Sequence, residues 1–339
     1  MRLIAAVASL WLLSSCASIP SKFDPKKHVV RQLSFWKEKG TLALPLEQKI
    51  MVPPSELLDC INQENIDQGW PNRPVAATLT ADIKKDIQDA LRELPELAKK
   101  KLNQNLVGIF IVNDLGGSAD TDSIFDENKK EVAGFVALDV TVLNRKANEW
   151  LTWKENSPFL ENPDYKIEAE IEKPQSNSRK NALQFILLHE LAHVISIGEG
   201  VHPSWEHITT ADPSPFSFSS LSWTLGADKK IISKYDEQFP ERAKIAYYRG
   251  PKSKTKFSKA ADIYSKLEQT NFVTLYATTN FTDDFAESFA TYVHEVLLKR
   301  SYSISIFYKG KLIKKYVPHW SDPKFEAKLK VIESVLKSQ

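Results

Sequence analysis

The most constraining feature of this sequence is a pair of histidines four residues apart inside an apolar stretch. His189 and His193 enclose Glu190, and the residues on both sides of the three are almost all apolar. This pattern predicts a buried helix over residues 179–196. Because residues four apart on a helix lie on one face, both imidazoles can reach a single metal ion. Glu190 then lies within reach of a water molecule at that ion.

The metal that this pattern usually binds is zinc, and a catalytic zinc ion needs a third protein ligand. Glu199, six residues after the second histidine, is a local candidate, and His202 and His207 are two others. Sites with a third ligand at that distance use a glycine three residues after the second histidine, where this chain has Ser196. A candidate further along the chain therefore fits better.

That candidate belongs to a second predicted helix, over residues 282–299. Thr282 is its expected N-cap, and acidic residues occupy its first turn, where the helix dipole favours them. Asp283 is in that turn, and Glu287 lies four residues later on the same face. Tyr276 precedes Asp283 by seven residues.

Together the two segments resemble the gluzincin metallopeptidases, most closely the group related to the catalytic domain of anthrax lethal factor. In that group a second helix carries the third ligand, usually Glu. A tyrosine stands seven residues before this ligand, and Phe-Ala and often another acid follow it. Tyr276, Asp283 and the segment 285–287, Phe-Ala-Glu, have this spacing. The chain departs from the group in carrying Asp where Glu is usual, so the second helix must approach the metal more closely.

The resemblance implies that Asp283 is the third ligand and that Glu287 hydrogen-bonds a ligand histidine, with Glu287 as ligand the alternative. It implies an α+β, zincin-like fold with a small mixed sheet, the HExxH helix and a mainly helical C-terminal part. The expected activity is hydrolysis of a peptide or protein substrate by metal-activated water, with Glu190 as general base. Tyr276 would donate a hydrogen bond to the oxyanion. Two alternatives remain: an inactive binding module and a zinc amidase acting on cell-wall peptides.

The N-terminus resembles a bacterial lipoprotein signal. Residues 1–15 have a positive start and an apolar run too short to span a bilayer as a mature helix, and they end in Leu-Ser-Ser before Cys16. We expect cleavage before Cys16 and attachment of lipid to it, which anchors the protein in the bacterial cell envelope. Ala17 is not an aspartate, so the outer membrane is the expected location. Cys60 is then the single cysteine of the mature chain, and no internal disulfide can form.

The rest of the chain divides into two expected parts. Residues 16–75 are predicted to be a tether and an N-terminal extension, with a short helix around Cys60. Residues 76–339 are predicted to be the catalytic domain, beginning with a helix capped by Thr80 and apolar at helical spacing as far as Leu97. Strands are predicted at residues 106–112 and 132–140, and the aspartate-rich residues between them are expected to form a solvated loop.

The strand at residues 132–140 is the expected edge strand, which would pair with an extended substrate. Further along, a hairpin is predicted over residues 303–316, and a last helix over residues 324–336. The chain has 45 Lys and Arg against 43 Asp and Glu, a net charge of +2. This balance excludes a dedicated nucleic-acid binder, which carries a strong basic excess. The local lysine clusters are expected to be solvated, with an acidic surface or anionic lipid as the alternative contact.

Overall fold

The structure is a computed structural model that describes residues 23–205, 208–248 and 255–337. The expected signal peptide, Cys16 and His207 lie outside these described residues. Among the helices of the described part, none combines the length and apolarity needed to cross a membrane.

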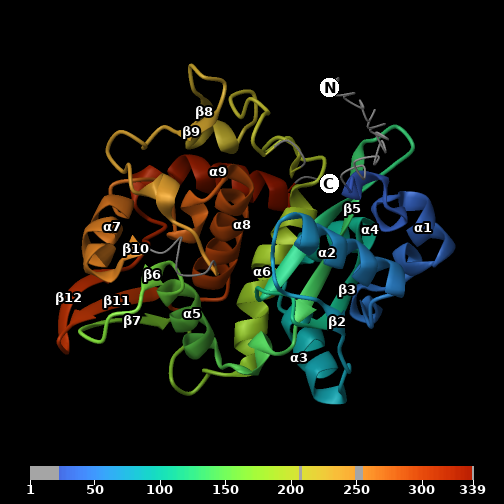
Figure 1. The fold of residues 1–339 in the computed structure, drawn as a ribbon, viewed down its shortest axis with the longest axis horizontal. Helices are drawn as coiled ribbons and strands as arrows, with labels where there is room; N and C mark the ends of the chain where they lie inside the picture. The colour runs from blue at the N-terminus through green and yellow to red at the C-terminus, as the bar shows by residue number, and fades with distance from the viewer. Residues whose placement is uncertain (1–22, 206–207, 249–254, 338–339) are drawn as a thin grey trace, which may run out of the picture.

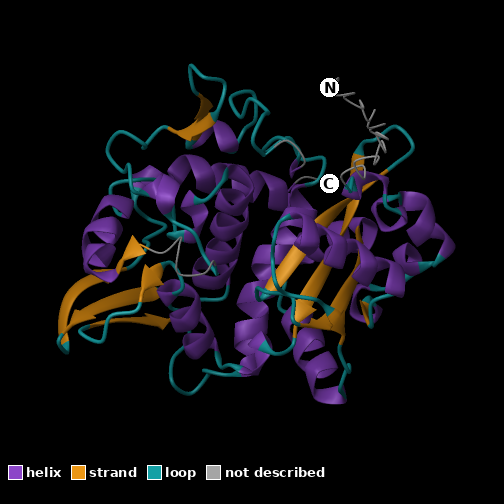
Figure 2. Cartoon of the chain, in the orientation of Figure 1, coloured by secondary structure: helices purple, strands orange, loops and turns teal. Residues whose placement is uncertain are grey.

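The chain has an α+β fold built on a small mixed sheet, as the sequence predicts (Figures 1 and 2). The sheet has the order β1-β3-β5-β4, and β2 also pairs with β3. Strand β3 runs parallel to β1 and β5 and antiparallel to β2, and β4 runs antiparallel to β5. The strands are β1 (Ile50–Met51), β2 (Val75–Ala76), β3 (Leu106–Asn113), β4 (Ala119–Phe125) and β5 (Glu131–Asp139).

The edge strand differs from the expectation. Strand β5, predicted to be the edge, lies inside the sheet, and β4 takes the edge position. Asp120 and Asp122 therefore belong to a strand and not to a solvated loop. The hydrophobic pattern missed this strand because polar residues dominate it. Only Ile124 and Phe125 at its end are large apolar residues that pack in the core.

Helices cover both faces of the sheet. Helices α3 (Ala81–Arg92), α4 (Glu96–Asn105) and α6 (Arg179–Ser196) contribute to the larger hydrophobic core. Helices α1 (Leu33–Glu38) and α2 (Ser55–Asp67) cover the other face with a smaller core. Because strand side chains alternate between the two faces, successive residues of β3 belong to different cores.

The described part of the expected tether is folded. Trp36 of α1 is buried against Phe110 of β3, with ring centroids 5.4 Å apart, and its Nε1 donates to the Val30 carbonyl at 2.7 Å. Strand β1 also comes from this region. The sequence pattern suggested a tether because these helical pieces are too short to show periodicity. Cys60 is buried in α2 as a free cysteine, and burial raises the pKa of its thiol.

The helix predicted after Thr80 is confirmed at its start and shorter at its end. The Thr80 side chain accepts a hydrogen bond from the Ile83 amide, which caps α3. Apolar residues continue at helical spacing beyond Arg92, but Pro95 interrupts the helix. Proline lacks an amide hydrogen and disfavours helical geometry in the residue before it, so a new helix, α4, begins at Glu96.

The C-terminal part is mainly helical, with a second, three-stranded sheet of order β12-β11-β7. The predicted hairpin is confirmed as β11 and β12, which turn at Lys309 and Gly310. The elements are α5 (Ala147–Asn156), β7 (Tyr165–Glu170), α7 (Ala260–Leu267), α8 (Phe281–Thr291), β11 (Ser303–Tyr308), β12 (Lys311–Tyr316) and α9 (Glu326–Lys337). Short strand pairs join β6 (Phe159–Leu160) to β10 (Thr255–Lys256) and β8 (Trp223–Leu225) to β9 (Ile231–Ser233).

Helix α8 begins one residue earlier than predicted, and its cap is Asn280 and not Thr282. The Asn280 side chain accepts hydrogen bonds from the amides of Thr282 and Asp283, each at 2.9 Å. After Thr291 the helix continues as a π-helix over Tyr292–Leu297. Helix α8 packs directly on α6, so the two segments singled out in the sequence lie side by side.

Candidate metal centre

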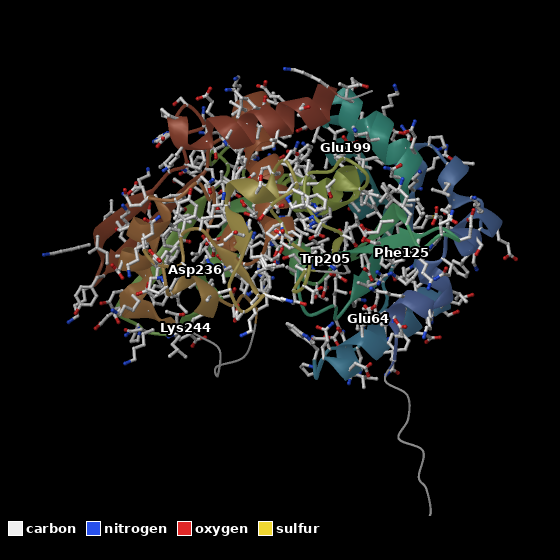
Figure 3. The ribbon with its side chains drawn as sticks, turned by 90° about the horizontal axis from the view of Figure 1, so that it is seen from above. Glu64, Phe125, Glu199, Trp205, Asp236 and Lys244 are labelled. Atoms are coloured by element: carbon white, nitrogen blue, oxygen red, sulfur yellow. The ribbon has the colours of Figure 1, made fainter. Side chains whose placement is uncertain are left out.

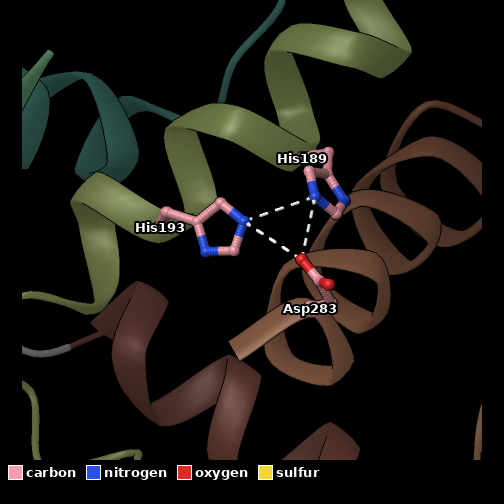
Figure 4. A group of neighbouring side chains, drawn as sticks. All are labelled: His189, His193 and Asp283. Carbon is pink, nitrogen blue, oxygen red and sulfur yellow. Dashed lines mark hydrogen bonds and ion pairs between the residues drawn. The ribbon is translucent and has the colours of Figure 1, made fainter. Parts of the chain in front are cut away.

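Two helices bring three side chains together at one point (Figure 4). His189 and His193 project from α6 with their Nε2 atoms 3.3 Å apart. Asp283 projects from α8, and its Oδ1 lies 3.7 Å from each of these nitrogens. All three side chains are close to fully buried. This buried group could hold a metal ion.

The spacing of the three ligand atoms suits zinc. Zn–N and Zn–O distances near 2.0–2.1 Å in tetrahedral geometry place ligand atoms about 3.3 Å apart. The observed sides of the triangle, 3.3 and 3.7 Å, are close to that value. The donor set of two imidazoles and one carboxylate is also one that zinc accepts with an open fourth position. The residues present therefore fit the ion, and the shorter aspartate reaches the histidines because α8 packs closely on α6.

Asp283 is held by residues at the start of its own helix. Its Oδ2 accepts hydrogen bonds from Thr279 Oγ1 at 2.7 Å and from Asn280 Nδ2 at 2.6 Å. Oδ1 is the oxygen left facing the two imidazoles. Asn280 thus has two roles, because its Oδ1 caps α8 while its Nδ2 orients the carboxylate.

Glu287 lies on the far side of the His189 ring from the site. Its Oε1 is 3.0 Å from His189 Nδ1 and 2.7 Å from Lys154 Nζ, and its Oε2 accepts a hydrogen bond from Thr274 at 2.6 Å. The residue is fully buried. Glu287 therefore contacts the nitrogen of His189 that points away from Asp283, which favours the orienting role and not the ligand role.

The charges of the centre are strongly coupled. Burial lowers the pKa of His189, but the carboxylates of Asp283 and Glu287 outweigh burial and raise that pKa to about 9. Burial and the neighbouring His189 together lower the pKa of His193 to about 3. Burial opposes ionisation of both carboxyl groups, yet the pKa of each is below its usual value, because His189 and His193 lower the pKa of Asp283 and Lys154 and His189 lower that of Glu287. Both carboxylates are thus ionised, which suits a cation at the centre.

Glu190 stands beside the three ligand atoms without joining them. Its Oε2 accepts a hydrogen bond from Thr121 Oγ1 at 2.6 Å. Thr121 lies on edge strand β4, so the sheet fixes this carboxylate. Burial raises the pKa of Glu190, and the nearby His189 and Thr121 oppose that rise. Sequence analysis missed Thr121 because it missed the strand.

Tyr276 lies beside His189, with ring centroids 5.5 Å apart, in the short 3-10 helix Tyr276–Thr278. The ring of Tyr247 packs edge-on against it at 4.8 Å. Burial raises the pKa of Tyr276 well above its usual value, so the phenol keeps its proton and can donate a hydrogen bond. The structure therefore places Tyr276 next to the metal group, as its sequence spacing requires.

Lys154 is a functional candidate that sequence analysis did not find. It lies on α5 and is buried, and its Nζ contacts Glu287 and stands 4.3 Å from the centre of the Tyr276 ring. One ammonium group therefore holds both the acid behind His189 and the tyrosine beside it. Lysine is almost never fully buried without a partner, so only the tertiary structure can reveal such a position.

The local third-ligand candidates lie elsewhere. Glu199 forms an ion pair with Lys101, away from the metal group. His202 packs against the rings of Phe281 and Phe285, and its Nδ1 lies 2.7 Å from the carbonyl oxygen of Pro203. Burial lowers the pKa of His202 to about 4. Neither residue belongs to the group that could hold an ion.

Three hollows meet at the metal centre. The sheet-side cavity, about 980 Å³, is lined by Thr121, Ser123 and Phe125 of β4 and by His193 and Trp205. The lysine cavity, about 950 Å³, is lined by residues that include Lys244, Lys256, Lys259, Tyr248, Tyr276 and Asp283. A small cavity of about 40 Å³ is lined by residues that include His189, Glu190 and Lys154, together with Tyr248 and Tyr276, which it shares with the lysine cavity.

The two large cavities lie in different halves of the molecule. Figure 3 shows Trp205 near the middle and Phe125 towards the sheet, whereas Lys244 lies in the C-terminal half. His193 lines the first cavity and Asp283 the second, so the metal centre is accessible from both. This arrangement leaves room for a chain that passes across the centre.

Comparison of the chain with known protein families, with curated proteins and with solved structures gives no match.

Proposed function

We propose that this protein is a zinc-dependent metallopeptidase with a zincin-like fold of the gluzincin type. The observation that carries the proposal is the triangle of His189, His193 and Asp283 ligand atoms with the Glu190 carboxylate beside it. A site for metal storage or for stability needs no such acid. A site for hydrolysis needs a base next to the ion that does not bind it.

The chemistry divides between the ion and the chain. Bound zinc supplies a Lewis acid that polarises the scissile carbonyl and makes water more acidic. Glu190, fixed by Thr121, accepts a proton from the attacking water and passes it to the leaving amine. Tyr276 donates a hydrogen bond to the oxygen on which negative charge develops. Glu287 and Lys154 hold His189 and Tyr276 in place.

Edge strand β4 supports a peptide as the substrate. It borders the sheet-side cavity and carries Thr121 directly beside Glu190. An edge strand can pair with an extended chain through backbone hydrogen bonds. A peptide that adds to β4 in this way would pass beside the general base, which is the geometry that peptide hydrolysis requires.

The test is the metal content and turnover of matched variants of the purified protein. Wild type should hold about one zinc per chain by elemental analysis. Glu190→Gln should keep the ion and lose roughly 10²–10⁴-fold in turnover of a peptide mixture, because proton transfer is lost. The control is Glu199→Gln, the same kind of substitution three residues after the end of α6, and it should stay active. Wild-type activity in Glu190→Gln would overturn the mechanism, and an inactive wild type would favour a binding module.

We further propose that a lipid on Cys16 anchors the protein in the bacterial cell envelope, at the outer membrane. The proposal rests on the sequence of residues 1–16. Cys16→Ala should move the protein from the membrane fraction to the soluble fraction. Membrane association of this variant, with no lipid found on the wild type by mass spectrometry, would contradict the anchor.

A further inference from the structure

The lysine cavity has a one-sided charge. Lys244, Lys256 and Lys259 line it with exposed side chains, and none of them has an ion-pair partner among the described residues. Asp283 is the one carboxylate in the described lining, and its charge faces the two histidines. The positive charge at the cavity is therefore uncompensated within the described chain.

The walls of the same cavity are aromatic. Trp70, Tyr247, Tyr248 and Tyr276 contribute to the lining. Tyr247 is fixed by a hydrogen bond to Glu155 at 3.2 Å and by its edge-on contact with Tyr276. The aromatic rings offer contact area to a peptide backbone and the ammonium groups offer charge to carboxylates, a combination that typifies selective sites.

The sheet-side cavity provides the contrast. Its described lining contains four lysines and five acidic residues, so its charges nearly cancel. A chain lying across the metal centre would thus meet a mixed surface on one side and a purely basic one on the other. The charge of the substrate would therefore affect its binding only in the lysine cavity, which Asp283 lines.

From this asymmetry we infer that the lysine cavity binds a carboxylate of the substrate within a few residues of the scissile bond. The substrate class is an acidic peptide, in which the carboxylate is an Asp or Glu side chain or the free C-terminus. The inference rests on the proposed peptidase function, because Tyr276 and Asp283 connect the cavity to the reacting centre. Fixed positive charge in a cleft also raises the local concentration of an anionic substrate.

The first test compares three peptides that differ only in Glu, Gln or Lys at one position near a cleaved bond. The bond is chosen from a bacterial peptide mixture whose cleavage sites are identified by mass spectrometry. Exposed ion pairs are individually weak, so three together should give roughly a tenfold higher kcat/KM for Glu than for Gln. The preference should shrink as salt is added.

Charge reversal assigns the preference to the cavity. The triple variant Lys244→Glu, Lys256→Glu and Lys259→Glu should lose the preference, so that its ratio of kcat/KM for the Glu peptide to that for the Gln peptide falls to about one or below. Its control is Lys27→Glu, Lys129→Glu and Lys130→Glu, which makes the same change at the sheet-side cavity. The control should keep the preference. A preference that survives in the first variant, or is absent in wild type, overturns the inference and leaves the peptidase intact.

A binding measurement separates the inference from catalysis. Fluorescence anisotropy of labelled Glu and Gln peptides on the zinc-loaded Glu190→Gln variant should show tighter binding of the Glu peptide, and the lysine reversal should abolish the difference. Peptides with a free or an amidated C-terminus decide which carboxylate is bound. If this binding occurs while wild type cleaves nothing, the lysine cavity still binds a peptide carboxylate, and it is the peptidase proposal that fails.

Anionic lipid is the competing ligand for the three lysines. Sedimentation with phosphatidylglycerol vesicles, using full-length protein that carries Cys16→Ala, tests it. We expect no change in sedimentation when the three lysines are reversed. Vesicle binding that depends on these lysines, together with equal binding of the Glu and Gln peptides, would replace the peptide carboxylate with a membrane surface.

Discussion

Helices α6 and α8 both supply the metal centre, but they hold their side chains in different ways. On α6, His189 is oriented by Glu287 of α8, whereas His193 is positioned by packing against Trp205 and its Nδ1 has no hydrogen-bond partner among the described residues. On α8, the Asp283 and Glu287 carboxylates accept four side-chain hydrogen bonds, from Thr279, Asn280, Thr274 and Lys154. Helix α6 therefore provides two of the three candidate ligand atoms, whereas α8 and the residues near it provide most of the hydrogen bonds that orient the side chains of the centre.

The largest expected effect is loss of the ion from either helix. His193→Ala and Asp283→Ala should each abolish tight zinc binding, because each removes one of three ligands. Glu287→Gln should bind zinc more weakly but still load. Competition with a chromophoric chelator measures all three affinities on one scale.

Two outcomes would contradict the roles assigned to Asp283 and Glu287. If Asp283→Ala keeps zinc and Glu287→Gln loses it, the two acids exchange roles. If both keep it, neither acid is the third ligand. Asp283→Glu restores the residue usual in the resembling group and should retain the ion, with activity depending on whether the closely packed helices admit one more methylene.

A smaller effect is expected from the residues that orient the centre. Glu287→Gln and Lys154→Met should each reduce zinc affinity or activity by roughly 10–100-fold, as is typical of residues that support a ligand histidine. Lys154→Met also leaves the Glu287 carboxylate buried without its cation, so it should lower the free energy of unfolding by about 3–5 kcal/mol.

The double variant Lys154→Met with Glu287→Gln separates these two effects. It should recover much of the stability lost in Lys154→Met, because no unpaired charge remains, and it should not recover the zinc affinity. Chemical unfolding and the chelator assay provide the two readouts. A double variant that regains full affinity would mean that neither side chain orients His189.

The smallest effect concerns the π-helical end of α8, which has no counterpart in α6. Burial lowers the pKa of His294 to about 4, with Arg300 adding to the effect and the carbonyls of Ile171 and Ser301 opposing it. Because the folded pKa is below the unfolded value near 6.5, His294 should reduce stability as the pH falls from 6.5 towards 4. The difference between the folded and unfolded pKa values corresponds to a loss of roughly 3 kcal/mol at most in the free energy of unfolding.

Unfolding of wild type and His294→Gln between pH 4 and 7 measures this contribution. The difference in unfolding free energy between the two proteins should change with pH in the acid range and be flat above pH 7. A constant difference throughout would show that the folded protein does not lower the pKa of His294.

Sequence pattern predicted those parts of the fold that depend on local physics. Apolar flanks set the bounds of α6, a side-chain cap set the start of α3, and a glycine turn set the hairpin of β11 and β12. Helical spacing also indicated His189 and His193 as a metal-binding pair, and the resemblance to the gluzincin group indicated Asp283 and Tyr276. In each case the sequence pattern that allows the prediction involves residues fewer than about eight positions apart.

Other features were decided by contacts between distant residues. Strand β4 is polar and gains its place from pairing with β5 and from the bond between Thr121 and Glu190, 69 residues apart. Lys154 is 133 residues from Glu287, and nothing near it in sequence marks a buried lysine. Trp36 and β1 join the core by packing on β3, although their own segments are too short to show a pattern.

The metal centre also depends partly on local sequence pattern and partly on contacts between distant residues. The sequence by itself determined which side chains can bind a metal, since a helix places residues four apart on one face whatever surrounds it. Only the tertiary structure decided which acid points at the histidines and which stands behind them. That choice depends on how α8 packs on α6 and on where Lys154 and Thr274 place the second carboxylate, and such contacts have no period along the chain.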